Sequence, residues 1–533
     1  MPDSDSPRAA PAAHPTDVEA SPDDDPLPAT PQPALTADLR AAFEAANWTV
    51  DAVTERLGEH GHRALGRNHT IPGLRSLAGD EDPVATLTRL WPLQDTVGLA
   101  ATQRALPGLV EPLCEAGFLT IDGALVRALV DIRPYGSDDG FSGWIAADLT
   151  PGLDGRLDAI ADDYVLGVSP ASSTMTQLAA RSRVGTAVDL GTGCGVQSLH
   201  LARHADQVIA TDVNPRALGL ARFTFALNGI DVDVRNGSLY GPLGEQRVDQ
   251  IVSNPPYVMA PPGSAHLTYR EGGMRADDLV REVVIGGARR LNRGGTLQVL
   301  GNWAHPVDGS WQERLAGWLA GTGCAAHIVE REYLPVAEYV ELWLADAGLI
   351  GTGGYRRAYE EWLDYFAAER IGGVGLGWIF LTRTDEADPD VVIEEWPHPV
   401  EMPIGPIAEQ RPVRSALARC SDDELLTSRP ILAADVVQET TGPPGQPDPA
   451  HVVLRQRRGF RRAVEVDTAL GGILGACDGE LRLGVIIDAV AGLLDTPAAP
   501  LRTETLNRIR PLITDGLLDL AENADREAER ETA

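Results

Sequence analysis

Short apolar runs alternate with helical patterns through the middle of the chain. The runs lie at 187–190, 207–211, 231–235, 250–253, 296–301 and 378–382. Each run is short, as buried strands are, and the stretches between the runs have helical spacing. Strand–helix alternation of this kind predicts an α/β fold with a parallel, doubly wound sheet over 151–384.

The segment before this sheet has helical spacing first and strand-like spacing afterwards. Leu35, Leu39 and Phe43 recur at helical spacing, and Thr36 is a candidate N-cap. Further helical patterns and then two strand-like runs follow, at 49–58, 83–90, 105–117, 124–132 and 144–149. Helices followed by a short hairpin predict a winged-helix-like module over 35–150. Such modules bind DNA, bind protein or pack against a catalytic domain, and the few basic residues here count against DNA.

The outer segments differ in composition from these units. Residues 1–34 hold nine prolines and many Ala, Ser and Asp, which predicts a disordered leader. Residues 385–450 are rich in Pro and acids and predict a linker region. Apolar helical patterns predict a second winged-helix-like module over 451–520, followed by an acidic tail at 521–533.

Composition and charge narrow the class of protein. A chain of 533 residues is too long for one hydrophobic core. It carries 77 acidic and 45 basic residues, and a formal net charge of −32 opposes non-specific binding to nucleic acid phosphates. The sequence shows neither an apolar run of about 18 residues nor a secretory signal, so we expect a cytoplasmic protein without membrane contact. Five scattered cysteines predict neither a disulfide framework nor a zinc site.

Three alternate glycines follow the run at 187–190. Gly191, Gly193 and Gly195 permit a tight turn and let the backbone approach a ligand closely. A dinucleotide site would require a sixth-position glycine where this chain has Val196. The spacing therefore favours a loop that contacts the methionine portion of S-adenosylmethionine.

Asp212 ends the next predicted strand, 17 residues after Gly195. A carboxylate at this place can accept both hydrogen bonds from a ribose diol. The alternative is an N-cap for the helix that begins near Pro215, and the two roles are compatible.

The sequence Asn254-Pro255-Pro256-Tyr257 comes directly after another predicted strand. The prolines make this loop rigid. The Asn254 side-chain oxygen and the Pro255 carbonyl can each accept a hydrogen bond from one planar NH2 group, which turns the nitrogen lone pair toward the sulfonium methyl. Tyr257 can stack on a flat substrate. Such a site works mainly by positioning, because the proton leaves readily once the nitrogen is cationic.

Together the three motifs resemble the Asn-Pro-Pro-Tyr branch of the class I S-adenosylmethionine-dependent methyltransferases, the small methyltransferase domain family, over roughly 165–384. That family includes protein-glutamine methyltransferases of release factors and guanine- or adenine-amino methyltransferases of RNA and DNA. The resemblance implies a seven-stranded Rossmann-like domain. It also implies a set of cofactor-binding residues, namely Asp189, Gly191, Thr192, Gly193, Gly195, Asp212 and Ser238. By the same resemblance the catalytic residues are Asn254, Pro255, Pro256 and Tyr257.

The sequence leaves two methyl acceptors possible: a glutamine of a release-factor-like protein, or a base of RNA or DNA. The acidity of the chain favours the protein, whereas the flanking modules favour nucleic acid. A cofactor-binding scaffold without turnover is a third reading, and the intact loop 254–257 argues against it. Many relatives place an acid near Ser238 for the adenine amino group, and serine can accept one hydrogen bond there.

Several further segments have two readings each. Residues 172–174 cover the cofactor or cap a helix, and residues 269–273 gate the cleft or form a plain loop. Residues 301–303 contact a ligand or pack in the core. Five arginines contact RNA phosphates or, as we favour, pair with nearby acids; they are Arg455, Arg457, Arg458, Arg461 and Arg462.

Overall fold

The computed structural model describes residues 33–156, 160–262, 272–444 and 450–520. The expected disordered leader lies outside these ranges except for its last two residues, and the expected acidic tail lies wholly outside them. Within the described ranges, no helix is both long enough and apolar enough to cross a membrane.

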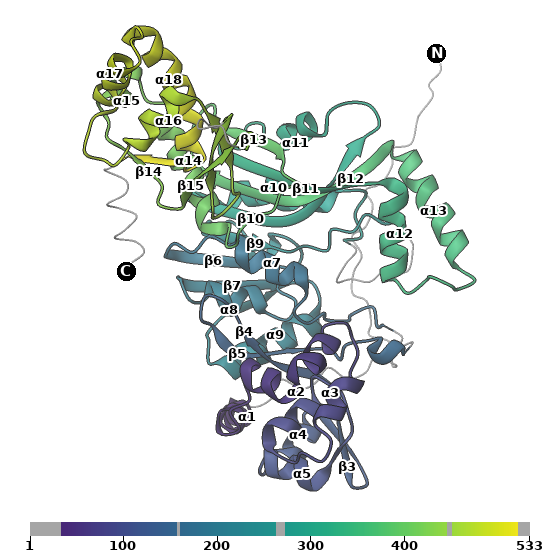
Figure 1. Ribbon diagram of the computed structural model, residues 1–533. Coiled ribbons are helices and arrows are strands. Elements are labelled where there is room, and N and C mark those ends of the chain that lie inside the picture. Colours follow the sequence, from purple (N-terminus) through teal and green to yellow (C-terminus); the bar gives the residue numbers. More distant parts are fainter. Residues whose placement is uncertain (1–32, 157–159, 263–271, 445–449, 521–533) are drawn as a thin grey trace, which may run out of the picture.

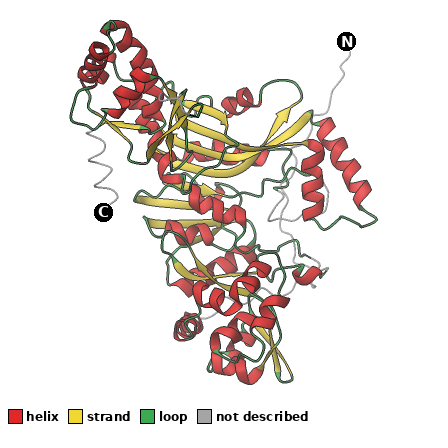
Figure 2. Ribbon diagram, in the orientation of Figure 1, coloured by secondary structure: helices red, strands yellow, loops and turns green. Residues whose placement is uncertain are grey.

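An eight-stranded sheet forms the centre of the molecule (Figures 1 and 2). Its order is β13-β11-β12-β10-β9-β6-β7-β8, and β12 runs antiparallel to both of its neighbours while the other pairs are parallel. The strands are β6 (Val184–Leu190), β7 (Ala205–Asp212), β8 (Asp233–Asn236), β9 (Val248–Ser253), β10 (Leu291–Pro306), β11 (Cys324–Pro335), β12 (Ile371–Arg383) and β13 (Val391–Glu395). The predicted doubly wound α/β fold is confirmed, with one strand more than the seven expected.

Helices cover both faces of this sheet, which is why its strands read as apolar runs. Side chains alternate along β6: Val188 and Leu190 pack toward one layer and Ala187 toward the other. The first layer consists of α10 (Asp278–Arg290) and α11 (Trp311–Leu319), and the second of α7 (Pro170–Leu178), α8 (Val196–Leu201) and α9 (Pro215–Asn228).

A helical hairpin connects β11 to β12 along the chain. It consists of α12 (Val336–Asp346) and α13 (Tyr355–Ala368) and lies where β10, β11 and β12 project beyond β9 (Figure 1, right). Val258 and Met259 pack into its core, and the Met259 amide donates to the Tyr339 hydroxyl at 3.0 Å. The hairpin therefore supports the chain directly after Asn254–Tyr257.

The N-terminal unit begins with α1 (Pro33–Ala45), so Thr36 lies buried inside the helix and the predicted N-cap is wrong. Proline, which lacks an N–H, starts this helix at its first turn. Three strands of the unit pair in the order β1-β3-β2. The other elements are α2 (Val50–Leu65), α3 (Ile71–Ser76), α4 (Pro83–Leu90), β1 (Val97–Gly98), α5 (Leu99–Ala105), α6 (Val110–Glu115), β2 (Leu119–Asp122) and β3 (Leu125–Ala128).

The predicted strand at 124–132 is divided between two sheets. Its first part is β3, and its end begins β4 (Asp131–Gly136), which pairs with β5 (Ser142–Ala147). This second hairpin packs on α9, where the Asn228 side chain accepts from the Trp144 amide at 3.0 Å and donates to its carbonyl at 2.6 Å. One continuous hydrophobic core thus joins the N-terminal unit to the sheet domain.

The expected linker at 385–450 is wrong, because most of it is folded. It holds β13, α14 (Gly405–Ala418), α15 (Asp422–Thr427), β14 (Pro430–Leu432) and β15 (Val436–Thr441). Ala418 and Leu425 belong to the same core as Ile487 and Ile513, so the C-terminal unit starts at α14 instead of 451. Its remaining elements are β16 (His451–Gln456), β17 (Ala463–Val466), α16 (Thr468–Gly475), α17 (Leu483–Leu493), α18 (Ala498–Thr514) and β18 (Leu518–Leu520).

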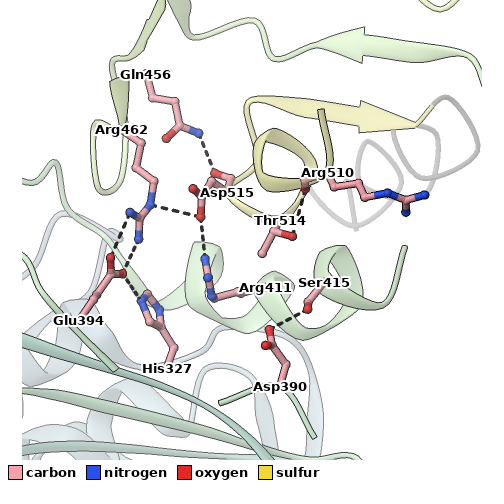
Figure 3. A network of polar contacts seen from close by, with 10 residues as sticks. All are labelled: His327, Asp390, Glu394, Arg411, Ser415, Gln456, Arg462, Arg510, Thr514 and Asp515. Carbon is pink, nitrogen blue, oxygen red and sulfur yellow. Dashed lines mark hydrogen bonds and ion pairs between the residues drawn. The ribbon is translucent and has the colours of Figure 1, made fainter. Parts of the chain in front are cut away.

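A polar network joins the C-terminal unit to the sheet (Figure 3). Glu394 of β13 accepts from His327 Nε2 at 2.6 Å and from Arg462 Nη1 at 3.2 Å. Asp515 forms ion pairs with Arg411 at 2.8 Å and with Arg462 at 3.3 Å. Burial raises the pKa of Glu394, but the hydrogen bonds from His327 and Arg462 outweigh it and hold that pKa at about 2.

Replacing Glu394 with glutamine should weaken the docking of the C-terminal unit by about 3 kcal/mol at pH 7, because His327 and Arg462 both lose a partly buried carboxylate partner and Arg462 keeps only Asp515. The folded pKa lies below the ordinary value of 4.5, so this stabilisation is present above pH 4.5 and is lost as the pH falls toward 2. Urea unfolding should therefore show a gap between parent and variant that narrows from pH 7 to pH 3. Glu395→Gln, at an exposed neighbour, is the control, and a gap of constant size would contradict the account.

Candidate active site

A cavity opens at the carboxyl ends of β6, β7 and β9, on either side of the point where the strand order reverses. Doubly wound sheets bind their ligands at this place because the loops on its two sides diverge. Eight of the predicted site residues line this central cavity: Gly191, Thr192, Gly193, Asp212, Ser238, Asn254, Pro255 and Pro256. Asp189, Gly195 and Tyr257 do not line it.

The glycine loop adopts backbone conformations that only glycine takes easily. Gly191, Gly193 and Gly195 have φ values of 78°, 53° and 91°. The amides of Gly191 and Thr192 both donate to the Thr211 carbonyl at 2.9 Å, which holds the loop against β7. A Cβ on Gly191 or Gly193 would meet no atom within 4 Å, so both positions border open space.

Gly195 has a packing role, and its predicted contact with the cofactor stays a prediction. A Cβ at this position would lie 2.6 Å from a ring carbon of Phe225, a buried residue of α9. The absence of a side chain therefore lets α8 begin close against α9.

Gly195→Ala should destabilise the domain by several kcal/mol, because the steric overlap adds to the cost of a positive φ. Gly193→Ala is the matched variant, with a positive φ but open space, and should cost about 1–2 kcal/mol. It should instead weaken cofactor binding, because its methyl group would enter the cavity. Thermal unfolding and calorimetric titration with S-adenosylmethionine separate the two effects, and equal loss of stability in both variants would contradict the assignment.

Asp189 does not line the cavity but supports the glycine loop from beneath, and its predicted contact with the cofactor stays a prediction. Its side chain is fully buried, and Oδ2 accepts from Thr192 Oγ1 at 2.7 Å, from Ser198 N at 3.0 Å and from Ser198 Oγ at 2.7 Å. Burial raises the pKa of this carboxyl to about 6. Asp189 thus ties the glycine loop to the first turn of α8.

Asp212 lies in the cavity wall at the end of β7. Its carboxylate accepts from the Gly193 amide at 3.0 Å and from the Asn214 amide at 2.9 Å. Asn214 is the N-cap of α9, because its side chain accepts from the Arg216 amide at 2.9 Å, so the N-cap alternative for Asp212 is wrong. Each carboxylate oxygen can accept more than one hydrogen bond, which leaves Asp212 able to bind a diol.

Asn254 lines the same cavity and carries a buried acceptor. Its Oδ1 atom has no hydrogen-bond partner among the described residues. Buried side-chain oxygens are nearly always hydrogen-bonded, so an unpaired one inside a cavity suits a donor on a ligand. Ser253 Oγ donates to the Leu190 carbonyl at 2.8 Å and fixes the strand end that carries Asn254.

Tyr257 does not line the cavity, and the stacking contact predicted for it stays a prediction. It is half-buried against the cluster under α10, and burial raises its pKa.

One side of the cavity is formed by a segment that was not predicted from the sequence. Tyr164, Val165 and Leu166 line it, although they precede the sheet and carry no recognisable motif. Asp148 holds this segment: it accepts from the Val165 amide at 2.8 Å and forms an ion pair with Arg216 at 2.6 Å. Asp148 and Arg216 lie 68 residues apart in sequence, so the contacts that place this segment leave no local signal.

Of the further segments that had two readings, one lines the cavity and another packs in the core. Ser172 lines the cavity, whereas the N-cap of α7 is Ser169, which accepts from the Ser172 amide at 3.1 Å, so the capping reading of 172–174 is wrong. Asn302 and Trp303 pack inside β10, which continues to Pro306, and neither lines the cavity. Residues 269–271 lie outside the described residues.

Two family models match the chain. Residues 168–315 match the methyltransferase small domain, and residues 45–129 match a domain of unknown function (DUF7059). A solved 16S rRNA N2 methyltransferase of T. Thermophilus, in complex with AdoMet and guanosine, aligns at 18% identity over 44% of this chain and 61% of that chain. Its TM-score of 0.25 is too low to support an argument about the site.

The curated relatives include two kinds of methyltransferase. Ribosomal RNA small subunit methyltransferase C of Salmonella arizonae is 30% identical over 178 residues, which cover 33% of this chain and 45% of that protein. Release factor glutamine methyltransferase of Geobacter sulfurreducens is 37% identical over 124 residues, which cover 21% of this chain and 43% of that protein. The chain thus spans less than half the length of each. Residues 168–315 belong to the methyltransferase small domain family of class I S-adenosylmethionine-dependent methyltransferases.

Proposed function

We propose that this chain transfers a methyl group from S-adenosylmethionine to a planar amide or amino nitrogen of a macromolecule. The observation that carries the proposal is the unpaired, buried Asn254 Oδ1 atom in the same cavity as Gly193 and Asp212. One cavity thereby combines groups suited to the cofactor with an acceptor suited to an N–H group.

The residues present fit the cofactor. The Asp212 carboxylate suits a ribose diol, and the open space beside Gly191 and Gly193 suits the methionine portion. Ser238 lines the wall where the adenine would lie, and its hydroxyl can accept one hydrogen bond from the adenine amino group. When bound, the cofactor supplies an activated methyl group on its sulfonium sulfur.

Asn254 and Pro255 would orient the acceptor. Their oxygens would accept the two N–H groups of a planar NH2, which leaves the nitrogen lone pair facing the methyl carbon. The carbon–nitrogen bond forms as the carbon–sulfur bond breaks, and the nitrogen then loses a proton to solvent. Positioning supplies most of the rate enhancement in such a reaction.

Two acceptor classes meet this requirement, a protein glutamine and a nucleobase amino group. The relatives are named for ribosomal RNA and for release factor glutamine, and each name fits one class. The net charge of −32 favours a protein acceptor, because it repels the phosphates of nucleic acid.

Transfer of label from methyl-labelled S-adenosylmethionine to a cell lysate tests the function and the acceptor class together. The account expects label in the macromolecular fraction, removed either by protease or by nuclease. If the parent protein binds the cofactor but no label reaches protein or nucleic acid, the chain would be a cofactor-binding scaffold without turnover.

A further inference from the structure

We propose that the turn between β16 and β17, together with the segment 396–399 after β13, forms a docking site for single-stranded RNA. The site lies outside the matched segment 168–315. The claim that it brings an acceptor to the central cavity rests on the nucleobase alternative of the proposed function, whereas the binding itself does not.

The site contains an aromatic pocket lined with cations. Trp396, His398, Pro399, Arg455, Arg461 and Ala463 line it. The rings of Trp396 and His398 meet edge to face with centroids 5.0 Å apart, and the Arg462 guanidinium lies 4.5 Å above the Trp396 ring. His398 and Arg461 are exposed, so an incoming ring could stack beside them.

The arginines of this turn do not all pair with acids, which corrects part of the expectation from sequence. Arg455 pairs with Glu439 at 3.0 Å, and Arg462 pairs with Glu394 and Asp515. Three other arginines are exposed and have no ion pair among the described residues: Arg457, Arg458 and Arg461.

Two acids close to the turn have no ion pair among the described residues: Asp435, and Glu401, whose backbone amide donates to the Gly459 carbonyl at 2.8 Å. The Asp435 carboxylate accepts from the Arg458 backbone amide at 3.0 Å. Arg331 donates to the carbonyls of Trp396 and His398, not to a carboxylate. The three unpaired arginines outnumber these two acids, so positive charge is in excess beside the pocket in a chain that is otherwise strongly acidic, and phosphate groups complement it.

The pocket lies at the same edge of the sheet as the central cavity. β13 runs parallel to β11, and β9 runs parallel to β10. Because β12 is antiparallel to both β11 and β10, these four strands all run in the same direction. Residues that follow β13 therefore leave the sheet on the side where Asn254 follows β9. Four strand spacings separate β13 from β9, which is roughly 20 Å.

The exposed His398 ring, the half-buried Trp396 ring and the unpaired arginines together suit single-stranded RNA. Its bases are free to stack on aromatic side chains, whereas the deep, narrow major groove of an RNA helix excludes such contacts. Arginines beside the stacking surface hold the phosphates without regard to sequence.

Fluorescence anisotropy of the full chain with a labelled, unstructured RNA of about 12 nucleotides tests this proposal. The variant R457Q/R458Q/R461Q should keep its melting temperature, because all three side chains are exposed. It should bind RNA at least about tenfold more weakly, and the slope of log K against log salt should fall by about two, at about 0.7 per lost phosphate contact. His398→Ala should weaken binding through lost stacking.

The control R75Q/R127Q/R289Q removes the same charge from exposed arginines elsewhere and should change the RNA affinity less than twofold. Equal losses in the two triple variants, or no loss in the first, would overturn the proposal. A glutamate-rich peptide that binds more tightly than RNA with the same arginine dependence would also overturn it and assign the site to an acidic protein segment. Cofactor titrations of the same proteins report on the proposed function independently.

Discussion

Replacing Asn254 with alanine is expected to cut methyl transfer about 10²–10³-fold while leaving the affinity for S-adenosylmethionine nearly unchanged. Asn254 follows β9 and lines the same cavity as Asp212, and its buried side-chain oxygen has no hydrogen-bond partner among the described residues. Removing one positioning acceptor from an enclosed site costs rate, because the acceptor nitrogen then samples orientations that do not face the methyl group. Single-turnover transfer to the identified acceptor, beside calorimetric cofactor binding, measures both quantities.

Asn254→Asp is the matched variant, since it keeps an acceptor oxygen at the same place. It should retain more activity than Asn254→Ala. If the alanine variant lost cofactor affinity and rate in equal measure, Asn254 would have a structural role. Full activity in the alanine variant would place the chemistry at another site.

Asp212→Ala is expected to raise the dissociation constant for S-adenosylmethionine at least about a hundredfold. The carboxylate would accept two charge-assisted hydrogen bonds from the ribose, each of about 1.5–3 kcal/mol. The substitution also frees the Gly193 amide, which now donates to Asp212 at 3.0 Å, and so loosens the glycine loop. Both effects act in the same direction, and calorimetric titration measures their sum.

Asp206 supplies the control for this experiment, because it lies near the opposite end of β7. It forms an exposed ion pair with Arg183, and exposed pairs contribute little to stability. Asp206→Ala should bind the cofactor as the parent does. Unchanged affinity in Asp212→Ala would remove the carboxylate from the cofactor site.

Local pattern was enough to predict the sheet strands that flank the cavity. β6, β7 and β9 are buried on both faces, so each appears in the sequence as a continuous apolar run. The motifs at Gly191, Asp212 and Asn254 follow these strands directly, and so their common location could be inferred from strand order.

The strands β11 and β13 were missed for a physical reason. β11 runs beyond its edge neighbour β13, so its second half carries the polar residues Arg331 and Glu332 at exposed or partly exposed positions. β13 is an edge strand of intermediate burial inside an acidic, proline-rich segment. Neither gives a clean apolar run, and only pairing with β12 and β11 identifies them.

The wall formed by Tyr164 and Val165 depends on tertiary contacts alone. Asp148 joins this segment to Arg216 of α9, and none of the three positions belongs to a recurrent motif. The same limit explains why the packing role of Gly195 was not predicted. Its contact with Phe225 becomes visible only when α8 and α9 lie together.

The most direct test of the account is to locate the transferred methyl group on the acceptor by mass spectrometry. After reaction with labelled S-adenosylmethionine, the purified acceptor would be digested and the modified residue or nucleoside fragmented. The account predicts one methyl group on an amide or exocyclic amino nitrogen, present with the parent protein and strongly reduced with Asn254→Ala. A methyl group on oxygen, carbon or sulfur would contradict it.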